Sequence, residues 1–460
     1  MQIVSINPAT NEVLTTMNET TEEEVKEMIH LAKNSFNSWS NLTIDERIKI
    51  LTEIYSVLEA NMEHLAELIS LGMGKPITQA EAEVKSTLKN IKWDLENVKK
   101  CIEPEITFES DTEIQKVFYE PKGVVTVISP FNYPFSLCLA QTFQNLLVGN
   151  VVIDKPDPSC ILLYQFLEEI FLNSKLPKGV QQFVFGGREI GSFLVEQDID
   201  MICFTGNTKT GEYLYQVASK KMIPILMELG GSAPGIILED ADIDSVIQGI
   251  FKKKFSNTGQ LCHALKRLIV HESKFEEVVE KLKDIAEKQV MGNPLDRNTT
   301  LGPIVNEKQL NTLITQYEDA VGRGAKVICG GNHSGNYFEP TILTNISKDM
   351  KVWKEEVFGP ILPIISFKTM EEAINLANDT IYGLGGYVFT TNMNTYERIS
   401  KELKTGMVSC NNLAYSAPYN PFGGVKKSGL GRTRGKWGYM GLCNIKTIVF
   451  EKSLGDDQNG

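Results

Sequence analysis

The stretch MICFTGNTKTGEYLYQVASK, residues 201–220, joins a short apolar run to a turn with glycine and then to a segment with helical spacing. Such strand–loop–helix units are the building blocks of parallel α/β sheets. Similar apolar runs precede it at 123–130, 150–156 and 181–187, and another follows at 224–231. This alternation predicts a parallel, doubly wound sheet. Because ligands bind at the carboxyl ends of the strands in such sheets, the loops after these runs are the candidate site.

Two further regions flank this α/β segment. Residues 21–100 show helical spacing of apolar residues, with capping threonines followed by glutamates, and predict helices. A second region of alternating strand and helix patterns begins near residue 234. Apolar runs at 113–120 and 444–452 predict two more strands outside these regions. We therefore expect an α/β protein with two doubly wound parts and a small β extension.

The composition argues against some classes of partner and indicates the cellular compartment. A chain of 460 residues is long enough for two or three domains, and its net charge of -12 argues against nucleic acid or an anionic membrane as a partner. The N-terminal residues do not resemble a secretory signal, and no apolar run is long enough to span a bilayer. The eight cysteines lack the close spacing of a zinc or redox motif. We expect a cytoplasmic protein without a bound metal.

Two motifs offer groups for covalent and acid–base chemistry. FSNTGQLC (255–262) places Cys262 after a Gly-Gln turn, where it is either a nucleophile or a buried structural thiol. MELGG (227–231) places Glu228 directly after an apolar strand. Burial there would raise its pKa toward the range of a general base, whereas a solvated strand end would not. The paired glycines favour the functional interpretation, because they allow backbone or ligand to approach closely.

Two other motifs offer groups that bind anions. In SPFNYP (129–134), the amide of Asn132 could donate to a developing oxyanion, or it could cap the next helix. FTGNTKTG (204–211) turns from a strand into a helix, which suits a pyrophosphate at the helix N-terminus. It lacks the three-glycine dinucleotide fingerprint, so by itself this motif is weak evidence.

Taken together and in this order, the four motifs resemble those of the aldehyde dehydrogenase family. Further matching segments are KP (155–156), EEVFGP (355–360) and PFGGVKKSG (421–429), and the resemblance extends from NPAT (7–10) to NIKT (444–447). The length and tail are similar to those of compact bacterial members, among them succinate-semialdehyde and lactaldehyde dehydrogenases. The resemblance implies the aldehyde dehydrogenase fold and NAD(P)-dependent oxidation of an aldehyde to a carboxylic acid.

The resemblance also implies a role for each catalytic residue. Cys262 would attack the aldehyde carbonyl, and the amide of Asn132 and the backbone N–H of Cys262 would stabilise the oxyanion. Loss of hydride to the nicotinamide would leave a thioester, which water activated by Glu228 would hydrolyse. Relatives that pass the thioester to coenzyme A usually lack this glutamate, so its presence favours release of a free acid. His263 is expected in the pocket wall and Lys266 in a structural role.

For the cofactor, the resemblance implies NAD, with NADP as the alternative. Lys155 would bond the adenosine ribose, and Asn207 would lie at the pyrophosphate, where the family usually has serine. Glu356 would hold the nicotinamide ribose, and Phe358 would pack beside the ring. The expected cofactor contacts are Ser129, Phe131, Lys155, Asp157, Gly187, Phe204, Thr205, Gly206, Asn207, Leu229, Glu356 and Phe358.

Two departures from the family pattern concern cofactor preference and proton transfer. Many relatives carry glutamate where this chain has Pro158, and Asp157 is the neighbouring carboxylate that could replace it. Many relatives also carry a lysine and a glutamate where this chain has Gln141 and Thr433. Losing both members of an ion pair leaves no unpaired charge, so an active enzyme with another proton exit is expected. A non-catalytic protein that kept the fold is the alternative from another class.

A third departure concerns the substrate. Succinate-semialdehyde dehydrogenases often carry arginines at the positions of Ala140 and Ser256, so the usual clamps for a carboxylate are missing. The basic run at 252–254 could replace them, although such a run is more often a solvated face. Specific oxidation of succinate semialdehyde is therefore the rival enzyme hypothesis. The expected substrate pocket consists of Tyr133, Leu137, Tyr415 and Phe422.

The resemblance further implies a division of the chain into three parts. Residues 1–107 and 122–233 would form a cofactor-binding domain, and residues 234–435 a catalytic domain. Residues 108–121 and 436–456 would form an oligomerisation arm. Exposed strand edges in that arm would need partners, which suits a homodimer or a homotetramer.

Overall fold

In the computed structural model, which describes residues 2–413 and 417–452, one six-stranded sheet carries most of the loops identified above. Its strands lie in the order β19 (Gly429–Leu430), β9 (Ile225–Glu228), β8 (Met201–Thr205), β5 (Val124–Ile128), β6 (Val151–Lys155) and β7 (Gln181–Phe183). All neighbours are parallel except β19, which runs antiparallel to β9. Because the strand order reverses between β5 and β8, the carboxyl ends of these two strands form the expected ligand crevice.

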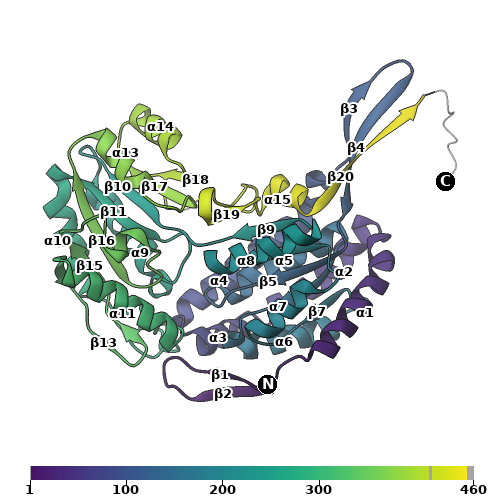
Figure 1. Ribbon diagram of the computed structural model, residues 1–460, viewed down its shortest axis with the longest axis horizontal. Helices are drawn as coiled ribbons and strands as arrows, with labels where there is room; N and C mark the ends of the chain where they lie inside the picture. The colour runs from purple at the N-terminus through teal and green to yellow at the C-terminus, as the bar shows by residue number, and fades with distance from the viewer. Residues whose placement is uncertain (1, 414–416, 453–460) are drawn as a thin grey trace.

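Helices cover both faces of this sheet (Figure 1). Those that connect its strands are α5 (Pro134–Val148), α6 (Ile161–Leu172), α7 (Arg188–Glu196) and α8 (Thr208–Lys221), with the short η1 (Pro158–Cys160) before α6. The N-terminal part of the chain adds β1 (Gln2–Ile6), β2 (Val13–Asn18), α1 (Glu22–Ser40), α2 (Ile44–Ala60), α3 (Met62–Met73) and α4 (Ile77–Cys101). Buried side chains of these helices and strands form one continuous apolar core.

The helical region at 21–100 contains a break that the apolar spacing did not predict. Helical spacing runs through residues 43–71, but α2 ends at Ala60 and α3 begins at Met62. Asn61 between them has φ of -111°, outside the helical region, and its side-chain amide donates to the backbone carbonyl of Val57 at 2.8 Å. Asparagine competes with the helix for backbone partners in this way, which ends the helix there.

The second sheet has seven strands within the described ranges. Their order is β12 (Lys326–Cys329), β15 (Thr341–Thr344), β16 (Ile361–Phe367), β11 (Leu265–His271), β10 (Ala233–Ile237), β17 (Gly385–Phe389) and β18 (Met407–Cys410), and β12 is antiparallel to β15. The helices of this region are α9 (Ile243–Phe255), η2 (Ser256–Gly259), η3 (Glu272–Lys274), α10 (Phe275–Ala286), α11 (Glu307–Gly322), α12 (Lys351–Lys354), α13 (Met370–Asn378) and α14 (Met393–Glu402). A small hairpin, β13 (His333–Ser334) and β14 (Tyr337–Phe338), completes it.

A three-stranded antiparallel arm projects from the body of the molecule (Figure 1). It consists of β3 (Glu105–Glu109), β4 (Glu113–Pro121) and β20 (Cys443–Glu451), and β20 pairs with β4 along its whole length. The strand β3 starts three residues before the arm boundary expected at 108. The segment expected from 436 opens with α15 (Gly435–Gly441), preceded by η4 (Lys426–Ser428).

The predicted α/β class, with two largely parallel sheets and a β arm, is confirmed. The exact domain boundaries stay a prediction. The pairing of β19 with β9 brings residues 429–430 to the edge of the first sheet, although the sequence analysis assigned them to the second α/β region. Within the described residues, no helix is both long enough and apolar enough to cross a membrane.

Candidate active site

Two cavities meet at the carboxyl ends of β5, β8 and β9. The first has a volume of about 440 Å³ and is lined by residues that follow these strands, together with Glu356 and Phe358. The second has a volume of about 530 Å³ and is lined by parts of α4 and α5, the segment around Cys262, and residues between 417 and 434. The residues common to both walls are Asn132, Leu137, Thr205, Glu228 and Cys262.

Cys262 follows a turn with an uncommon backbone. Asn257 and Thr258 in η2 both have φ of 52°, and Gly259 has φ of 75°. A Cβ at Gly259 would lie 2.2 Å from the carbonyl oxygen of Gly359, so no larger residue fits without rearrangement. Left-handed non-glycine residues cost free energy, and they persist where the surroundings hold them, often at functional sites. This turn presents Cys262 to both cavities.

Burial favours the protonated form of the Cys262 thiol. Burial raises its pKa to about 11, although the nearby charge of Lys266 acts in the opposite direction. Nδ1 of His263 lies 3.6 Å from the sulfur. Burial holds the pKa of His263 well below its usual range, so this ring is neutral at pH 7 and is no cationic partner for a thiolate. Because the thiolate is the nucleophilic form, the thiol has to lose its proton as it reacts.

The carboxyl group of Glu228, at the end of β9, is buried between the cavities. Neither of its oxygens accepts a hydrogen bond from the part of the chain that the structure describes. Burial raises the pKa of Glu228 to about 8, and the charges of Arg432 and Arg434 act in the opposite direction. A carboxyl group with this pKa is present in both forms just above neutral pH, which suits proton exchange with water.

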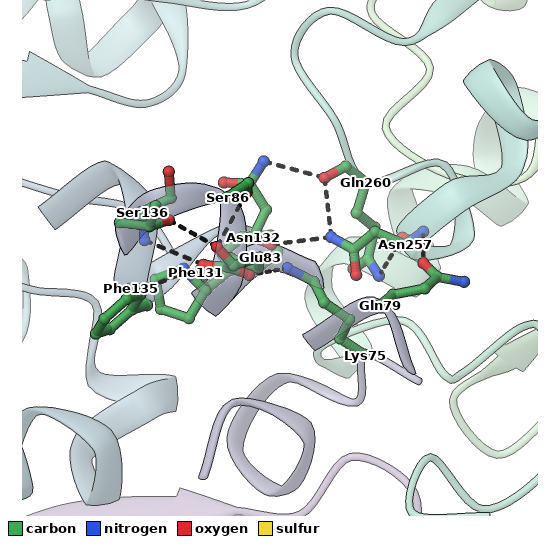
Figure 2. A network of polar contacts seen from close by, with 12 residues as sticks. Lys75, Gln79, Glu83, Ser86, Phe131, Asn132, Phe135, Ser136, Asn257 and Gln260 are labelled. Carbon is green, nitrogen blue, oxygen red and sulfur yellow. Dashed lines mark hydrogen bonds and ion pairs between the residues drawn. The ribbon is translucent and has the colours of Figure 1, made fainter. Parts of the chain in front are cut away.

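Asn132 is held by the turn that precedes the thiol. Its side-chain amide donates to the backbone carbonyl of Gln260 at 3.0 Å, and its own backbone carbonyl accepts from the amide of Asn257 at 2.9 Å. Figure 2 shows these side chains bridging the loop after β5 and the turn that contains Gln260. The two contacts fix the amide of Asn132 relative to the segment that carries Cys262.

A buried ion pair lies behind Asn132 (Figure 2). Lys75, which follows α3, pairs with Glu83 of α4, and both side chains are fully buried. Glu83 also accepts two backbone hydrogen bonds of 3.1 Å from residues 135–136 in the first turn of α5. The ammonium group of Lys75 lies 3.5 Å from the centre of the Tyr133 ring. A carboxylate at the N-terminus of α5 stabilises that helix, and the pair therefore positions the loop that carries Asn132.

All the expected cofactor contacts except Gly187 line the first cavity. They are Ser129, Phe131, Lys155, Asp157, Phe204, Thr205, Gly206, Asn207, Leu229, Glu356 and Phe358. Gly187, itself a described residue, lines neither cavity. It lies at the N-cap of α7, where its backbone N–H donates to the carboxylate of Glu19 at 2.6 Å.

The walls of the first cavity suit a dinucleotide. The N-terminus of α8 borders it through Asn207 and Thr210, and a helix N-terminus attracts a pyrophosphate. Glu356 lies on another wall, where it pairs with the buried Lys266 and accepts the N–H of Gly231 at 3.1 Å. A carboxylate held in this way can accept hydrogen bonds from ribose hydroxyls. Lys266 is thus the partner of Glu356, and its structural role stays a prediction.

Comparison with known proteins identifies the class of this site. The model of the aldehyde dehydrogenase family matches residues 1–448. The chain belongs to this family. The predicted class, an NAD(P)-dependent aldehyde dehydrogenase, is thereby confirmed.

Individual relatives of this aldehyde dehydrogenase are similar over almost the whole chain. The mitochondrial succinate-semialdehyde dehydrogenase of Arabidopsis thaliana is 35% identical, over 98% of this chain and 85% of its own length. The peroxisomal aminoaldehyde dehydrogenase 1 of Pisum sativum is 35% identical, over 97% of this chain and 92% of its own length. A solved NADP-dependent enzyme from E. coli has a TM-score of 0.95 at 31% identity, covering 98% of this chain and 95% of that one.

The second cavity of the aldehyde dehydrogenase contains most of the expected substrate pocket. Tyr133, Leu137 and Phe422 line it. Tyr415, the fourth expected residue, lies outside the described residues. The ring of Phe422 packs edge to face with His263 at a centroid distance of 5.8 Å. Apolar and aromatic side chains therefore reach as far as the residue next to Cys262.

Two of the departures from the family pattern also lie in this cavity. Gln141 and Thr433 both line it. The side-chain oxygen of Gln141 is buried and accepts no hydrogen bond from the described residues. Thr433 forms a two-way backbone bridge with Phe422, with both hydrogen bonds at 2.8 Å. In this aldehyde dehydrogenase, neutral groups at these positions line the second cavity.

The basic run at 252–254 was expected to form a solvated face. For Lys254 this expectation is wrong. Lys252 is exposed, but Lys254 is fully buried, and its ammonium group makes no hydrogen bond to the described residues. The reason is that the last turn of α9 packs into the core beside Phe255, which is also buried. Among the described residues that line the second cavity, none comes from this run.

Sequence reasoning missed three residues that act on the site. Lys75 and Glu83 support the loop that carries Asn132, and Arg434 lines the second cavity. The ion pair joins Lys75, in the connection before α4, to Glu83 on α4, and no recognised sequence motif marks such a buried pair. Two features of the sequence could have drawn attention to these residues. Lys75 stands between a glycine and a proline at 74–76, and Arg434 directly precedes Gly435.

Proposed function

We propose that this enzyme oxidises an aldehyde to the free carboxylic acid through a thioester on Cys262. The observation that carries the proposal is that the two cavities share Cys262, Glu228 and Asn132 in their walls. A substrate in one cavity and a cofactor in the other would therefore both reach the same sulfur. The class of reaction follows from the family, and the roles of these residues are the proposal.

The first half of the reaction forms the thioester. The sulfur of Cys262 transfers its proton to water in the cavity and bonds to the carbonyl carbon, whose oxygen becomes an oxyanion. The second hydrogen of the Asn132 amide, beside the one donated to Gln260, and the backbone N–H of Cys262 are the proposed oxyanion donors. The nicotinamide of a bound NAD(P) would supply the acceptor for the hydrogen of that carbon, as a hydride. The carbonyl re-forms, and the acyl group remains on sulfur.

The second half releases the acid. Glu228 removes a proton from water, whose oxygen bonds to the thioester carbon while the carbon–sulfur bond breaks. The departing sulfur regains a proton, which restores the thiol of Cys262. The buried carboxyl group of Glu228, without a hydrogen-bond donor in the described residues, supports this role, because water is its available partner. Hydrolysis, without transfer to coenzyme A, is therefore the proposed outcome.

We further propose that the cofactor lies in the first cavity, with NAD preferred over NADP. Asp157 lines this cavity beside Lys155, and its carboxylate accepts the N–H of Ser159 at 2.9 Å. A fixed carboxylate there would repel a 2′-phosphate. Replacing Asp157 with serine should shift the ratio of kcat/KM values toward NADP. An unchanged ratio would contradict the preference.

A panel of aldehydes tested with NAD and with NADP examines the proposed function directly. Each assay follows absorbance of the reduced cofactor and measures the free acid. We expect one acid released for each cofactor reduced, without coenzyme A. The proposal fails if aldehydes give no reduction, or if the acyl group appears only as a coenzyme A thioester.

We also propose a homo-oligomer that works in the cytoplasm. The arm exposes Ile106, Phe108, Ile445, Val449 and Phe450, and such apolar side chains on a projecting sheet need a partner surface. All eight cysteines, each in the described part of the chain, are free thiols, which supports a reducing compartment. Light scattering coupled to size exclusion would measure the mass. A monomer at micromolar concentration would contradict the assembly.

A further inference from the structure

Arg434 occupies an unusual backbone position in the wall of the second cavity. It has φ of 67° and ψ of 159°, a region that side chains other than glycine rarely adopt. Its neighbours fix it there. Thr433 is bridged to Phe422, and the N–H of Gly435 donates to the carbonyl of Pro418 at 2.9 Å. The segment that carries Arg434 is thus tied to the segment that forms the facing part of the cavity wall.

A short series of contacts connects Arg434 with the thiol. Its guanidinium lies 5.1 Å from the centre of the Phe422 ring. That ring packs edge to face against His263 at 5.8 Å, and Nδ1 of His263 lies 3.6 Å from the sulfur of Cys262. Arg434 and Cys262 therefore belong to one cavity wall and are separated by two rings. Both residues line the second cavity.

The charges in this cavity favour an anion at that end. Among the described residues that line it, the positively charged side chains are Arg434 and the exposed Lys89. The carboxylic acid in the wall is Glu228, and burial raises its pKa to about 8, so it is mostly neutral at pH 7. His263 is neutral at that pH as well, because burial lowers its pKa. A cationic aldehyde would face two like charges, whereas an anionic one would face two opposite charges.

We propose that Arg434 determines substrate specificity by binding an anionic group, a carboxylate or a sulfonate, at the end of the aldehyde remote from the carbonyl. The inference rests on the proposed function, because it assumes that the carbonyl binds at Cys262. The planar guanidinium can donate two parallel hydrogen bonds to a carboxylate. Phe422 and Leu137 supply apolar surface for the methylene groups between the two ends.

Three aldehydes with the same four-carbon chain test the proposal. They are succinate semialdehyde, which is anionic, butanal, which is neutral, and 4-(trimethylammonio)butanal, which is cationic. We expect the unmodified enzyme to show the highest kcat/KM with succinate semialdehyde and the lowest with the cation. Arg434→Gln should reduce the ratio of kcat/KM for succinate semialdehyde to that for butanal by about 10- to 100-fold, the usual value of a hydrogen bond to a charged group.

A second variant separates the loss of the guanidinium from a folding defect. Arg434→Gly removes the guanidinium and places glycine where φ is positive, so we expect a melting temperature at or above that of the unmodified enzyme. Its substrate ratio should fall as it does in Arg434→Gln. Lys436→Gln is the matched control, because it removes one positive charge from an exposed residue outside the cavity. That control should keep the original ratio.

The outcomes separate this proposal from the proposed function. If the unmodified enzyme oxidises none of the three aldehydes, the proposed function is in question. If it oxidises butanal as efficiently as succinate semialdehyde, or if both Arg434 variants keep the ratio, the role of Arg434 is overturned. An equal loss of kcat with all three aldehydes, together with a shifted pH profile, would also overturn it. That result would show that Arg434 acts through Glu228, because the charge of Arg434 lowers the pKa of Glu228.

Succinate provides a test of binding that needs no turnover. As a four-carbon diacid without an aldehyde, it should inhibit butanal oxidation competitively in the unmodified enzyme. Arg434→Gln should weaken this inhibition about 10-fold or more. Equal inhibition constants in the two proteins would contradict the assignment.

Discussion

The side-chain amide of Asn132 donates to the backbone carbonyl of Gln260 at 3.0 Å, two residues before Cys262. The donor comes from the loop after the first strand of one sheet, and the acceptor belongs to the turn that leads into the other sheet. One hydrogen bond thus connects the proposed oxyanion donor to the segment of the proposed nucleophile. Electrostatic stabilisation of this kind depends on donors that are in place before the charge develops.

Replacing Asn132 with alanine should lower kcat by about 100- to 1,000-fold, the usual effect of removing one oxyanion donor. The KM of the aldehyde should change much less, because the donor acts on the transition state. Steady-state kinetics with butanal would measure both values. A reduction of kcat below about threefold would exclude the amide as an oxyanion donor.

Replacing Cys262 with alanine should abolish aldehyde-dependent reduction of the cofactor, because no other group can form the thioester. Cofactor binding, measured by calorimetry, should persist in this variant. Cys160→Ala is a control on thiol chemistry in general, since Cys160 is a buried cysteine whose thiol lines neither cavity in the described structure. Turnover that survives in Cys262→Ala would refute the nucleophile assignment.

Replacing Glu228 with glutamine should stop the reaction after the first half. Rapid mixing should show a burst of reduced cofactor equal to the number of sites, and mass spectrometry should find the acyl group on Cys262. In the unmodified enzyme, the general base must be ionised, so thioester hydrolysis should rise with pH through the pKa of about 8 and then level off. Steady turnover with the same pH profile in Glu228→Gln would exclude the base role.

The same substitution should stabilise the fold at alkaline pH. Because burial raises the folded-state pKa of Glu228 from 4.5 to about 8, the unfolded chain releases this proton first as pH rises. Stability from the protonated carboxyl is therefore full below about pH 4.5 and is lost as pH rises toward 8. Glutamine cannot ionise, so the gain in melting temperature for Glu228→Gln should be larger at pH 8 than at pH 5. Scanning calorimetry at the two pH values would measure it, and equal shifts would contradict the burial of this charge.

Replacing Lys75 with methionine should destabilise the protein by about 3–5 kcal/mol, because it leaves the carboxylate of Glu83 buried without its cation. The double variant Lys75→Met/Glu83→Gln should be less destabilised, since no buried charge remains. Chemical unfolding monitored by fluorescence would compare them. If Lys75→Met costs no more than an exposed control such as Lys85→Met, the pair does not support the loop of Asn132.

Short motifs at strand ends were informative because the fold brings such ends together. Ser129, Lys155, Thr205 and Glu228 each follow or end a strand of the first sheet, and all of them line the cavities. A parallel sheet places these positions at one edge, so local sequence predicts a shared site. Gly187 also follows a strand, β7, but β7 is the edge strand, and the glycine at the N-cap of α7 lines neither cavity.

The remaining features depend on how tertiary packing buries particular side chains. Lys75 lies in the connection between α3 and α4 and pairs with Glu83 eight residues later on α4. Arg434 reaches the second cavity because residues 433–435 are tied to residues 418–422. Lys254 is buried although it belongs to a basic run. In each case, the burial of a charged side chain follows from tertiary packing, which the composition of a short window does not reveal.

The two cavities share only a small patch of wall around Cys262, and each reaches the surface through residues of its own. Lys308 is exposed on the first, and Tyr419 is exposed on the second. With the nucleotide in the first cavity and the acid in the second, as proposed, we expect that either product can depart while the other remains bound. The order of product release should then follow their relative affinities.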